Sequence, residues 1–158
     1  MTLRPFEDLV TEHGGVVMRV CRAIVGEDDA QDAWSETFLA ALRAYPDLRP
    51  DSNTRGWLVT IAHRKAIDQF RRSRRLEPVS DVPEIPSLDE PRALDMVLRA
   101  HLDALPPKQR GAVIYHYLAD LPYAEVGVLL ESSEAAARRS AADGLAKLRT
   151  TYAKEISR

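Results

Sequence analysis

The 158-residue chain has little of what marks several classes of protein. It contains a single cysteine, Cys21, and four scattered histidines, which excludes an intramolecular disulfide and offers no spacing for a structural zinc site. No stretch approaches the roughly 18 apolar residues that a membrane span needs, and residues 1–10 lack the apolar core of a signal peptide. These absences predict a soluble, cytoplasmic protein without membrane insertion.

An excess of one charge sign is also missing. The chain has 22 Lys+Arg and 24 Asp+Glu, so its formal net charge is −2. A protein held to nucleic acid by bulk positive charge is excluded, because non-specific phosphate binding scales with the cations presented. The balance hides local differences: residues 1–75 and 93–158 each carry +1, and residues 76–92 carry −4. Any nucleic-acid role must therefore come from local patches.

Glycine is scarce, and apolar residues recur at three- and four-residue spacing along most of the chain. This pattern predicts an all-α fold. Residues 76–92 contain four prolines and five acids, a proline density that no helix tolerates. We therefore expect two small helical domains, residues 1–75 and residues 93–158, joined by an acidic, proline-rich linker over residues 76–92.

The apolar spacing also predicts individual helices. One runs through residues 30–45, buries Leu42 with other apolar side chains, and ends at Pro46. Residues 46–55 lack periodicity and are expected to form an exposed loop, with a new helix beginning at Gly56. In the second domain, the spacing of Val113, Ile114, Tyr117 and Leu118 predicts a further helix.

The strongest local signal surrounds residues 131–133. A short helix, a tight polar turn and a second amphipathic helix have the spacing of a helix-turn-helix, and Ser133 is a suitable N-cap for the second helix. An ordinary helical hairpin fits this spacing about as well. In a helix-turn-helix, the first residues of the second helix lie at base edges in the major groove. Those residues would be Ser133, Glu134, Ala135, Arg138 and Arg139.

A basic run lies in the first domain. Residues 63–75 hold six cations and one acid, and they follow the polar loop and Trp57. Such an arrangement suits nucleic acid, with cations on phosphates and the loop free to hold an unstacked base. The alternative is a solvated helix face, because the helix dipole favours cations near a helix C-terminus.

An acidic run precedes it, with five carboxylates within residues 27–36. The facing Glu-x-x-His elements of helical di-metal sites are missing, so a surface for a basic protein partner is favoured over a metal site. Solubilising charge is the alternative. The chain also lacks a nucleophile elbow, a phosphate-binding glycine loop and a zinc-protease signature, so we expect neither catalysis nor a cofactor nor a metal.

The order of these segments resembles the extracytoplasmic-function group of bacterial sigma factors, which are promoter-recognition subunits of RNA polymerase. Residues 32–39, DAWSETFL, resemble the family segment that binds the clamp helices of the polymerase's largest subunit. Residues 57–63, WLVTIAH, with the cations that follow, resemble the helix that engages the minus-ten promoter element. Residues 105–110, LPPKQR, and residues 123–126, YAEV, resemble the domain that reads the minus-thirty-five element. Glu131 stands where the family commonly has glycine.

The resemblance implies a sigma factor that binds core RNA polymerase, directs it to specific promoters and assists promoter melting, with no enzymatic activity or cofactor of its own. It implies polymerase binding by Asp32, Ser35 and Glu36, and minus-thirty-five binding by the helix-turn-helix residues named above. The minus-ten residues would be Asn53, Thr54, Arg55, Trp57, Arg64, Lys65, Arg71, Arg72, Arg74 and Arg75.

Core RNA polymerase and promoter DNA are the partners that this resemblance implies, and an anti-sigma factor is a further one. Two other functions stay open from the residues alone. A stand-alone helix-turn-helix transcriptional regulator would bind a specific duplex without polymerase. A helical adaptor would have no nucleic-acid role at all.

Overall fold

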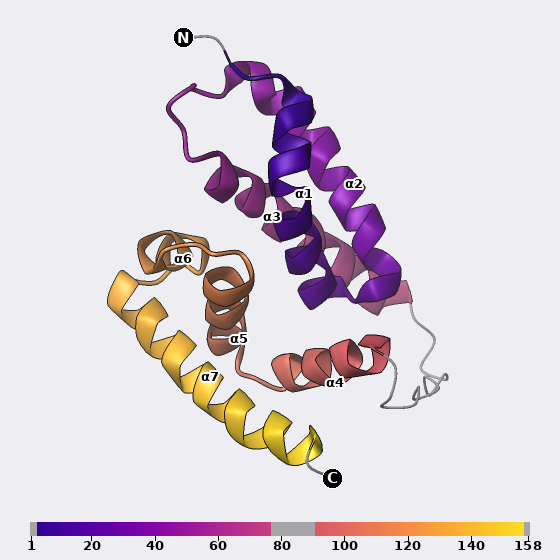
Figure 1. The fold of residues 1–158 in the computed structure, drawn as a ribbon, viewed down its shortest axis with the longest axis vertical. Coiled ribbons are helices and arrows are strands. Elements are labelled where there is room, and N and C mark those ends of the chain that lie inside the picture. The colour runs from indigo at the N-terminus through magenta and orange to yellow at the C-terminus, as the bar shows by residue number, and fades with distance from the viewer. Residues whose placement is uncertain (1–2, 77–90, 157–158) are drawn as a thin grey trace. The chain divides into compact units, whose positions relative to one another are not determined.

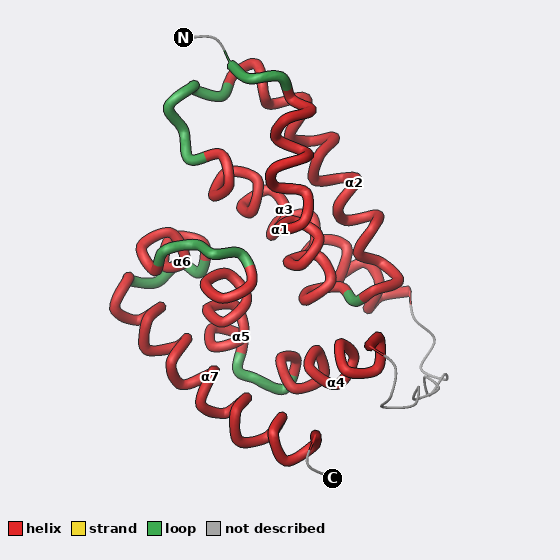
Figure 2. Tube along the Cα trace, viewed as in Figure 1, coloured by secondary structure: helices red, strands yellow, loops and turns green. Residues whose placement is uncertain are grey.

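The computed structural model describes residues 3–76 and 91–156. Every regular element over these residues is a helix, as Figure 2 shows, which confirms the all-helical prediction. The chain divides into two compact units, Met1–Leu76 and Glu77–Arg158 (Figure 1). Both ends of the linker predicted over residues 76–92 belong to helices, because one helix ends at Leu76 and the next begins at Pro91. Proline is tolerated at this first helical position, since the N–H that it lacks would have no partner within the helix. Residues 77–90 lie outside the described residues.

Unit 1 consists of helices α1 (Phe6–Val25), α2 (Glu27–Ala44) and α3 (Thr54–Leu76), with a short 3-10 turn, η1 (Tyr45–Asp47), after α2. Each of the three long helices packs against the other two. Gly26 alone separates α1 from α2. Its φ of 87° lies in the left-handed region, where glycine avoids the steric penalty of a Cβ atom, so it allows the abrupt change of direction.

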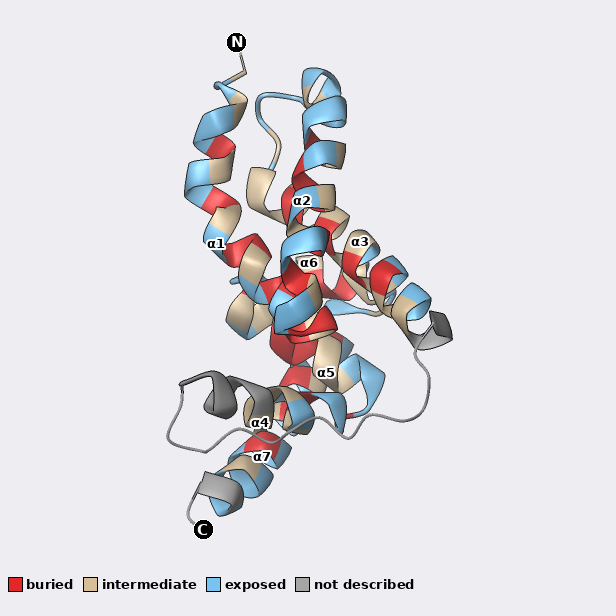
Figure 3. Ribbon diagram, turned by 90° about the vertical axis from the view of Figure 1, so that its right-hand side faces the viewer, coloured by how far each residue is buried: buried red, intermediate tan, exposed pale blue. Residues whose placement is uncertain are grey.

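The core of unit 1 forms where the buried stripes of the three helices meet, coloured red in Figure 3. In α2 this stripe contains Ala33, Phe38 and Ala41, and the expectation that Leu42 is buried is wrong, because 50% of it is exposed. Leu42 lies about 100° around the helix from Ala41, which turns it away from α1 and α3. The main buried side chains are Leu9, Val17, Val20, Cys21, Phe38, Leu58, Val59 and Ala62.

Unit 2 contains α4 (Pro91–Asp103), α5 (Pro107–Val113), the π-helical turn η2 (Ile114–Leu118), α6 (Tyr123–Leu129) and α7 (Glu134–Ile156). The long helix α7 packs against α4, α5 and α6. Gly144 lets α7 approach α5 closely, because a Cβ atom there would lie 2.9 Å from Cγ2 of Val113.

The π-helical turn changes which side chains of residues 113–118 are buried. Tyr115 is 2% exposed, whereas Tyr117, one of the apolar residues whose spacing predicted this helix, is 45% exposed. The N–H of Ala119 donates to the carbonyl of Ile114 at 3.1 Å, an i to i+5 hydrogen bond that widens the helix. The predicted helix is thus present, but it is π-helical over Ile114–Leu118.

Candidate protein and nucleic-acid interfaces

The outer face of α2 carries one stripe of polar and apolar side chains, which we call the α2 stripe: Asp32, Ser35, Leu39 and Leu42. The spacing of three and four residues places them on one side of the helix. Asp32 and Ser35 are exposed, and the two leucines are 53% and 50% exposed. Sequence reasoning missed both leucines as surface residues, although the same spacing could have extended the polar stripe to them.

A groove of about 660 Å³ lies between α2 and α3. It brings together residues that the sequence analysis assigned to two different partners, because Glu36 lines it on one side and Arg72 on the other. The Nη2 atom of Arg72 lies 3.5 Å from Oε2 of Glu36. The two predicted surfaces therefore meet along this groove. Its lining residues are Glu36, Leu39, Ala40, Arg43, Lys65, Asp68, Arg71 and Arg72.

The loop before α3 is shorter than predicted. The expected loop over residues 46–55 is wrong at both ends, since η1 covers Tyr45–Asp47 and α3 begins at Thr54. Asn53 explains the early start, because its Oδ1 accepts from the N–H of Gly56 at 3.1 Å and thereby caps the helix. Among the predicted minus-ten residues, Asn53 thus has a structural role, and Thr54 and Arg55 belong to the first helical turn.

Arg55 lies close to a buried histidine of α1. His13 is 6% exposed, and burial is the main cause that lowers its pKa; the charge of Arg55 adds to this, whereas Glu12 opposes it. The Nδ1 of His13 and the Nε of Arg55 are buried without a hydrogen-bond partner among the described residues. In the first turn of α3, Trp57 contacts Tyr45 of η1, with ring centroids 6.4 Å apart.

Most of the described cations in the basic half of α3 are exposed to solvent. Arg64, Arg71 and Arg72 are exposed and Lys65 is half-buried, whereas the side chains of residues 74 and 75 lie outside the described residues. Burial lowers the pKa of His63 on the same helix, and the charges of Arg64 and Arg71 lower it further. His63 therefore adds little positive charge near neutral pH.

The turn between α6 and α7 has the geometry of a Schellman motif. The N–H of Ser132 donates to the carbonyl of Gly127 at 2.8 Å, and Glu131 adopts a φ of 54°. Gly127 sits under the turn, where a Cβ atom would lie 2.9 Å from the carbonyl oxygen of Ser132. Helix α7 then begins with the predicted N-cap, because Oγ of Ser133 accepts from the N–H of Ala136 at 3.0 Å.

The five residues predicted to lie at base edges form one exposed surface at the start of α7, which we call the α7 face. All of them are exposed, while Ala137 and Ala141 on the opposite side are buried. The small side chain of Ala135 would allow backbone and bases to approach closely. The α7 face consists of Ser133, Glu134, Ala135, Arg138 and Arg139.

Arg138 lies at the end of a stack of side chains from three elements. Its Cζ is 4.6 Å from the ring centroid of Tyr123 in α6, and its Nη2 is 3.5 Å from Oε1 of Glu134. Tyr123 in turn stacks on His116 of η2, with centroids 3.8 Å apart and planes at 14°. Burial and a hydrogen bond with Tyr117 raise the pKa of the Tyr123 hydroxyl.

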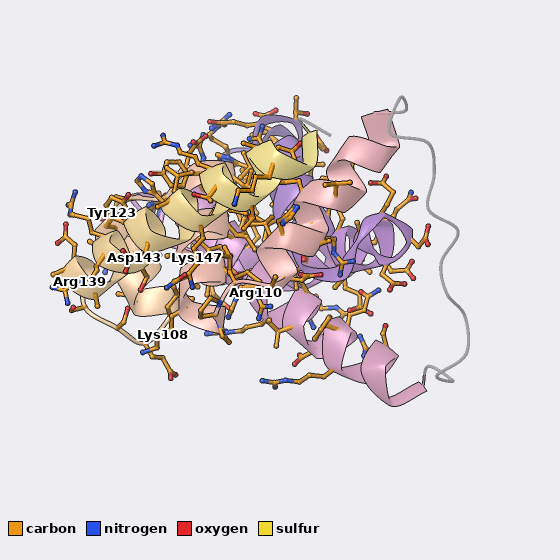
Figure 4. All side chains as sticks on the ribbon, turned by 90° about the horizontal axis from the view of Figure 1, so that it is seen from below. Lys108, Arg110, Tyr123, Arg139, Asp143 and Lys147 are labelled. Carbon is orange, nitrogen blue, oxygen red and sulfur yellow. The ribbon has the colours of Figure 1, made fainter. Side chains whose placement is uncertain are left out.

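Further charged residues continue this surface along α5 and α7, as the labels in Figure 4 allow the reader to follow. Arg139, Asp143 and Lys147 recur every four residues on α7 and are all exposed. Lys108 and Arg110 lie at the start of α5. This part of α5 is close to α7, because a Cβ atom added to Gly144 would lie 3.2 Å from the carbonyl oxygen of Gln109. The sequence analysis included Lys108 and Arg110 in the segment that resembles the minus-thirty-five domain but assigned them no contact. It did not single out Lys147, which the spacing of four in α7 could have identified.

Two kinds of site are missing from the part of the chain that the structure describes. No group of three or more His, Cys, Asp or Glu side chains there could hold a metal ion. No helix among these residues is both long and apolar enough to cross a membrane.

Comparison with known proteins gives both units a family. Residues 9–76 match the family model for sigma-70 region 2, and residues 95–148 match that for sigma-70 region 4. The chain is 32% identical to the RNA polymerase sigma factor CarQ of Myxococcus xanthus, over 91% of this chain and 87% of CarQ. It is 29% identical to the ECF RNA polymerase sigma factor SigE of Mycolicibacterium smegmatis, over 96% of this chain but only 63% of SigE.

Solved structures agree with these matches. The chain is similar to CnrH in complex with the cytosolic domain of CnrY, with a TM-score of 0.71 at 26% identity over 94% of this chain and 88% of that one. It shares the fold of the sigma factor RpoE, solved with the anti-sigma factor NepR from Bartonella quintana, with a TM-score of 0.73 at 18% identity over 92% and 94% of the two chains. Fold and sequence together define a transcription initiation factor. The chain belongs to the sigma-70 family of RNA polymerase sigma factors, in its extracytoplasmic-function group.

Proposed function

We propose that this protein binds core RNA polymerase and directs it to specific promoters, whose minus-ten and minus-thirty-five elements it recognises and whose melting it assists. The observation that carries this proposal is the succession of a region 2 match on unit 1 and a region 4 match on unit 2, each with its charged surface exposed. A protein with this role works in the cytoplasm, together with the polymerase. It acts by binding, and the polymerase performs the chemistry.

The α2 stripe is the surface that we assign to polymerase. Asp32 and Ser35 supply polar contacts, with Glu36 beside them, and exposed leucines supply apolar area at the same place. Exposed leucines that adjoin carboxylates suit a partner helix with both basic and apolar side chains, because the apolar area contributes affinity and the charges steer the encounter. Leu39 and Leu42 thus join the three residues expected from the sequence.

The loop at residues 48–53 and helix α3 are the parts that we assign to the minus-ten element. Cations on α3 would lie on phosphates, while Arg55 and Trp57, beside the loop, are candidates for contact with an unstacked base. Binding an extruded base offsets an unpairing cost of a few kcal/mol, which is how binding alone assists melting. This assignment covers Asn53, Thr54, Arg55, Trp57, Arg64, Lys65, Arg71, Arg72, Arg74 and Arg75.

The α7 face is the part that we assign to the minus-thirty-five element, with the second helix of a helix-turn-helix in the major groove. Lys108 and Lys147 flank it and would add phosphate contacts. An anti-sigma factor is a further partner that we propose, since both solved relatives were obtained with another protein bound, one of them named as an anti-sigma factor.

Reconstituted transcription tests the whole proposal. The chain is added to core polymerase and to promoter fragments mapped from transcript starts after its overexpression. We expect transcripts that depend on both the chain and the promoter. Absence of such transcripts, together with absence of binding to core polymerase, would reject a sigma factor. Tight binding of the chain alone to one specific duplex would favour a stand-alone regulator instead.

A charge reversal tests the assignment of the α2 stripe. Asp32→Arg should weaken binding to core polymerase at least about tenfold, because a like charge placed against a basic partner costs more than about 1.4 kcal/mol. Asp32 is exposed, so the fold should be retained. Glu7→Arg is the matched control, an exposed acid of α1 in the same unit. Equal affinity of both variants for core polymerase would show that the interface lies elsewhere.

A further inference from the structure

The guanidinium of Arg138 is held from two sides and yet remains accessible. Its Cζ lies 4.6 Å from the centroid of the Tyr123 ring, and its Nη2 forms an ion pair with Oε1 of Glu134, one turn earlier in α7, at 3.5 Å. The side chain is still 62% exposed. These contacts restrict the plane of the guanidinium without covering its hydrogen-bond donors.

The ring beneath Arg138 is itself fixed by a second layer. Tyr123 stacks on His116 at 3.8 Å with nearly parallel planes, and a ring nitrogen of His116, Nδ1, lies 2.8 Å from the carbonyl oxygen of Leu121. Tyr117 contacts His116 as well, with ring centroids 4.8 Å apart and planes at 81°. The stack therefore connects η2, α6 and α7, and the Tyr123 ring cannot move without disturbing its contact with His116.

The neighbouring cation offers a contrast. Arg139 is exposed at the next position of α7 and has neither an ion pair nor a ring contact with any described residue. It is free to follow a phosphate in any direction, which gives attraction without sequence information. Recognition of a base by arginine needs a guanidinium that is held in one orientation, with its plane aligned to the O6 and N7 acceptors of guanine.

We propose that Tyr123 is a positioning residue that orients Arg138 to read one guanine of the minus-thirty-five element, while Arg139 supplies sequence-independent affinity. The inference rests on the proposed function, because it needs α7 in the major groove. Holding the guanidinium in advance lowers the entropy lost when it forms two hydrogen bonds with a base. The stack thus gives Arg138, but not the adjacent Arg139, the fixed orientation that base-specific recognition requires.

Upstream-sequence selection by the holoenzyme tests this inference. The full chain, assembled with core polymerase, selects from promoter fragments randomised over the minus-thirty-five element. Arg138→Ala should flatten the preference at one base pair, where the wild type favours guanine by roughly five- to 150-fold. Tyr123→Leu should reduce the preference at the same base pair by about two- to fivefold. Tyr123→Phe, which keeps the ring, should select like the wild type.

A double variant separates positioning from a general loss of structure. If Tyr123 acts through Arg138, adding Tyr123→Leu to Arg138→Ala should leave the remaining preferences unchanged. A uniform loss of affinity in Tyr123→Leu, an unchanged preference, or a further effect in the absence of Arg138 would each overturn the inference. A wild-type holoenzyme that selects no upstream sequence would instead reject the proposed function itself.

Discussion

Arg72 of α3 forms an ion pair with Glu36 of α2, with 3.5 Å between Nη2 and Oε2 across the groove that separates the two helices. The carboxylate belongs to the surface assigned to polymerase and the guanidinium to the surface assigned to DNA. Both side chains are partly exposed, so the pair adds at most about 1 kcal/mol to stability. The pair matters more for binding than for stability, because each side chain partly neutralises the charge that the other offers to a partner.

The first prediction concerns DNA binding by the chain without polymerase. Glu36→Gln removes the carboxylate that competes with phosphate for Arg72, so the variant should bind DNA more tightly at low salt. One additional phosphate contact should steepen the salt dependence, the slope of log K against log salt, by about 0.9. Fluorescence anisotropy with a labelled duplex at several salt concentrations measures both quantities.

Glu27→Gln serves as the control, because Glu27 is an acid of the same helix that pairs with Arg22 at 3.0 Å, away from the groove. It removes the same charge and should leave the salt dependence close to that of the wild type. Equal slopes for the two variants would contradict a local competition for Arg72 and indicate a general effect of net charge.

The second prediction concerns the turn of the helix-turn-helix. Glu131 has a φ of 54°, a conformation that a residue with a Cβ atom adopts at a cost. Glu131→Gly should therefore stabilise unit 2 by about 1 kcal/mol. Glu131→Ala removes the charge but keeps the Cβ atom, so it should give little gain. Amide hydrogen exchange in α6 and α7 measures the difference, and equal protection in both variants would mean that the backbone strain is negligible.

The third prediction concerns Gly127, beneath the same turn. Gly127→Ala places a Cβ atom 2.9 Å from the carbonyl oxygen of Ser132 and 3.0 Å from the carbonyl carbon of Ser133. These are backbone atoms of the turn and cannot retreat independently, so we expect a loss of about 1–3 kcal/mol. Gly15→Ala is the control, since nothing lies within 4 Å of its Cβ position and the helix should gain up to about 1 kcal/mol.

Hydrogen exchange of unit 2 and tryptophan fluorescence of unit 1 report these two effects separately, since both tryptophans belong to unit 1. Full protection of α7 in Gly127→Ala would mean that the turn accommodates the added Cβ atom without loss of stability. Such a result would contradict the close packing that we infer for Gly127.

The fourth prediction concerns the pH dependence of unit 1. Burial lowers the pKa values of His13 and His63 below the ordinary 6.5. The unfolded chain therefore takes up protons at a higher pH than the folded one, and the free energy of unfolding decreases as the pH falls through about 6.5. The slope reaches at most about 1.4 kcal/mol per pH unit for each histidine.

Urea unfolding followed by tryptophan fluorescence between about pH 7.5 and pH 5 measures this loss. The Glu12 carboxylate does not interfere, because its pKa is lowered from 4.5 by its hydrogen bond with Arg4, and the stability it contributes is lost only at lower pH. His13→Gln should reduce the slope. An unchanged slope in that variant would assign the pH dependence to other groups.

Local chemistry explains which features could be predicted from the sequence. The N-cap at Ser133 needs only one hydroxyl and the amides of the following turn, so its neighbours in the chain determine it. The all-helical fold follows equally from local periodicity. Asn53 shows the limit of this approach, because its cap begins α3 inside the segment expected to be a loop.

The remaining features depend on contacts between elements. No periodicity places Arg72 beside Glu36, 36 residues apart, because that contact depends on how α2 and α3 cross. The outward position of Leu42 was missed since hydrophobicity alone predicts burial, although exposed apolar residues are common at binding surfaces. The stack on Arg138 requires three elements to meet, and only tertiary structure determines that.

The π-helical turn over Ile114–Leu118 has a consequence for how this protein family could vary. A π turn holds one more residue than an α turn, so removing a single residue from this stretch would restore regular α-helical spacing and preserve a continuous helix. The rings of His116 and Tyr117 would then rotate away from Tyr123, which they now support. If Arg138 reads a base as proposed, the number of residues at this point, rather than any substitution in α7, would change promoter choice while the side chains of the α7 face stay the same.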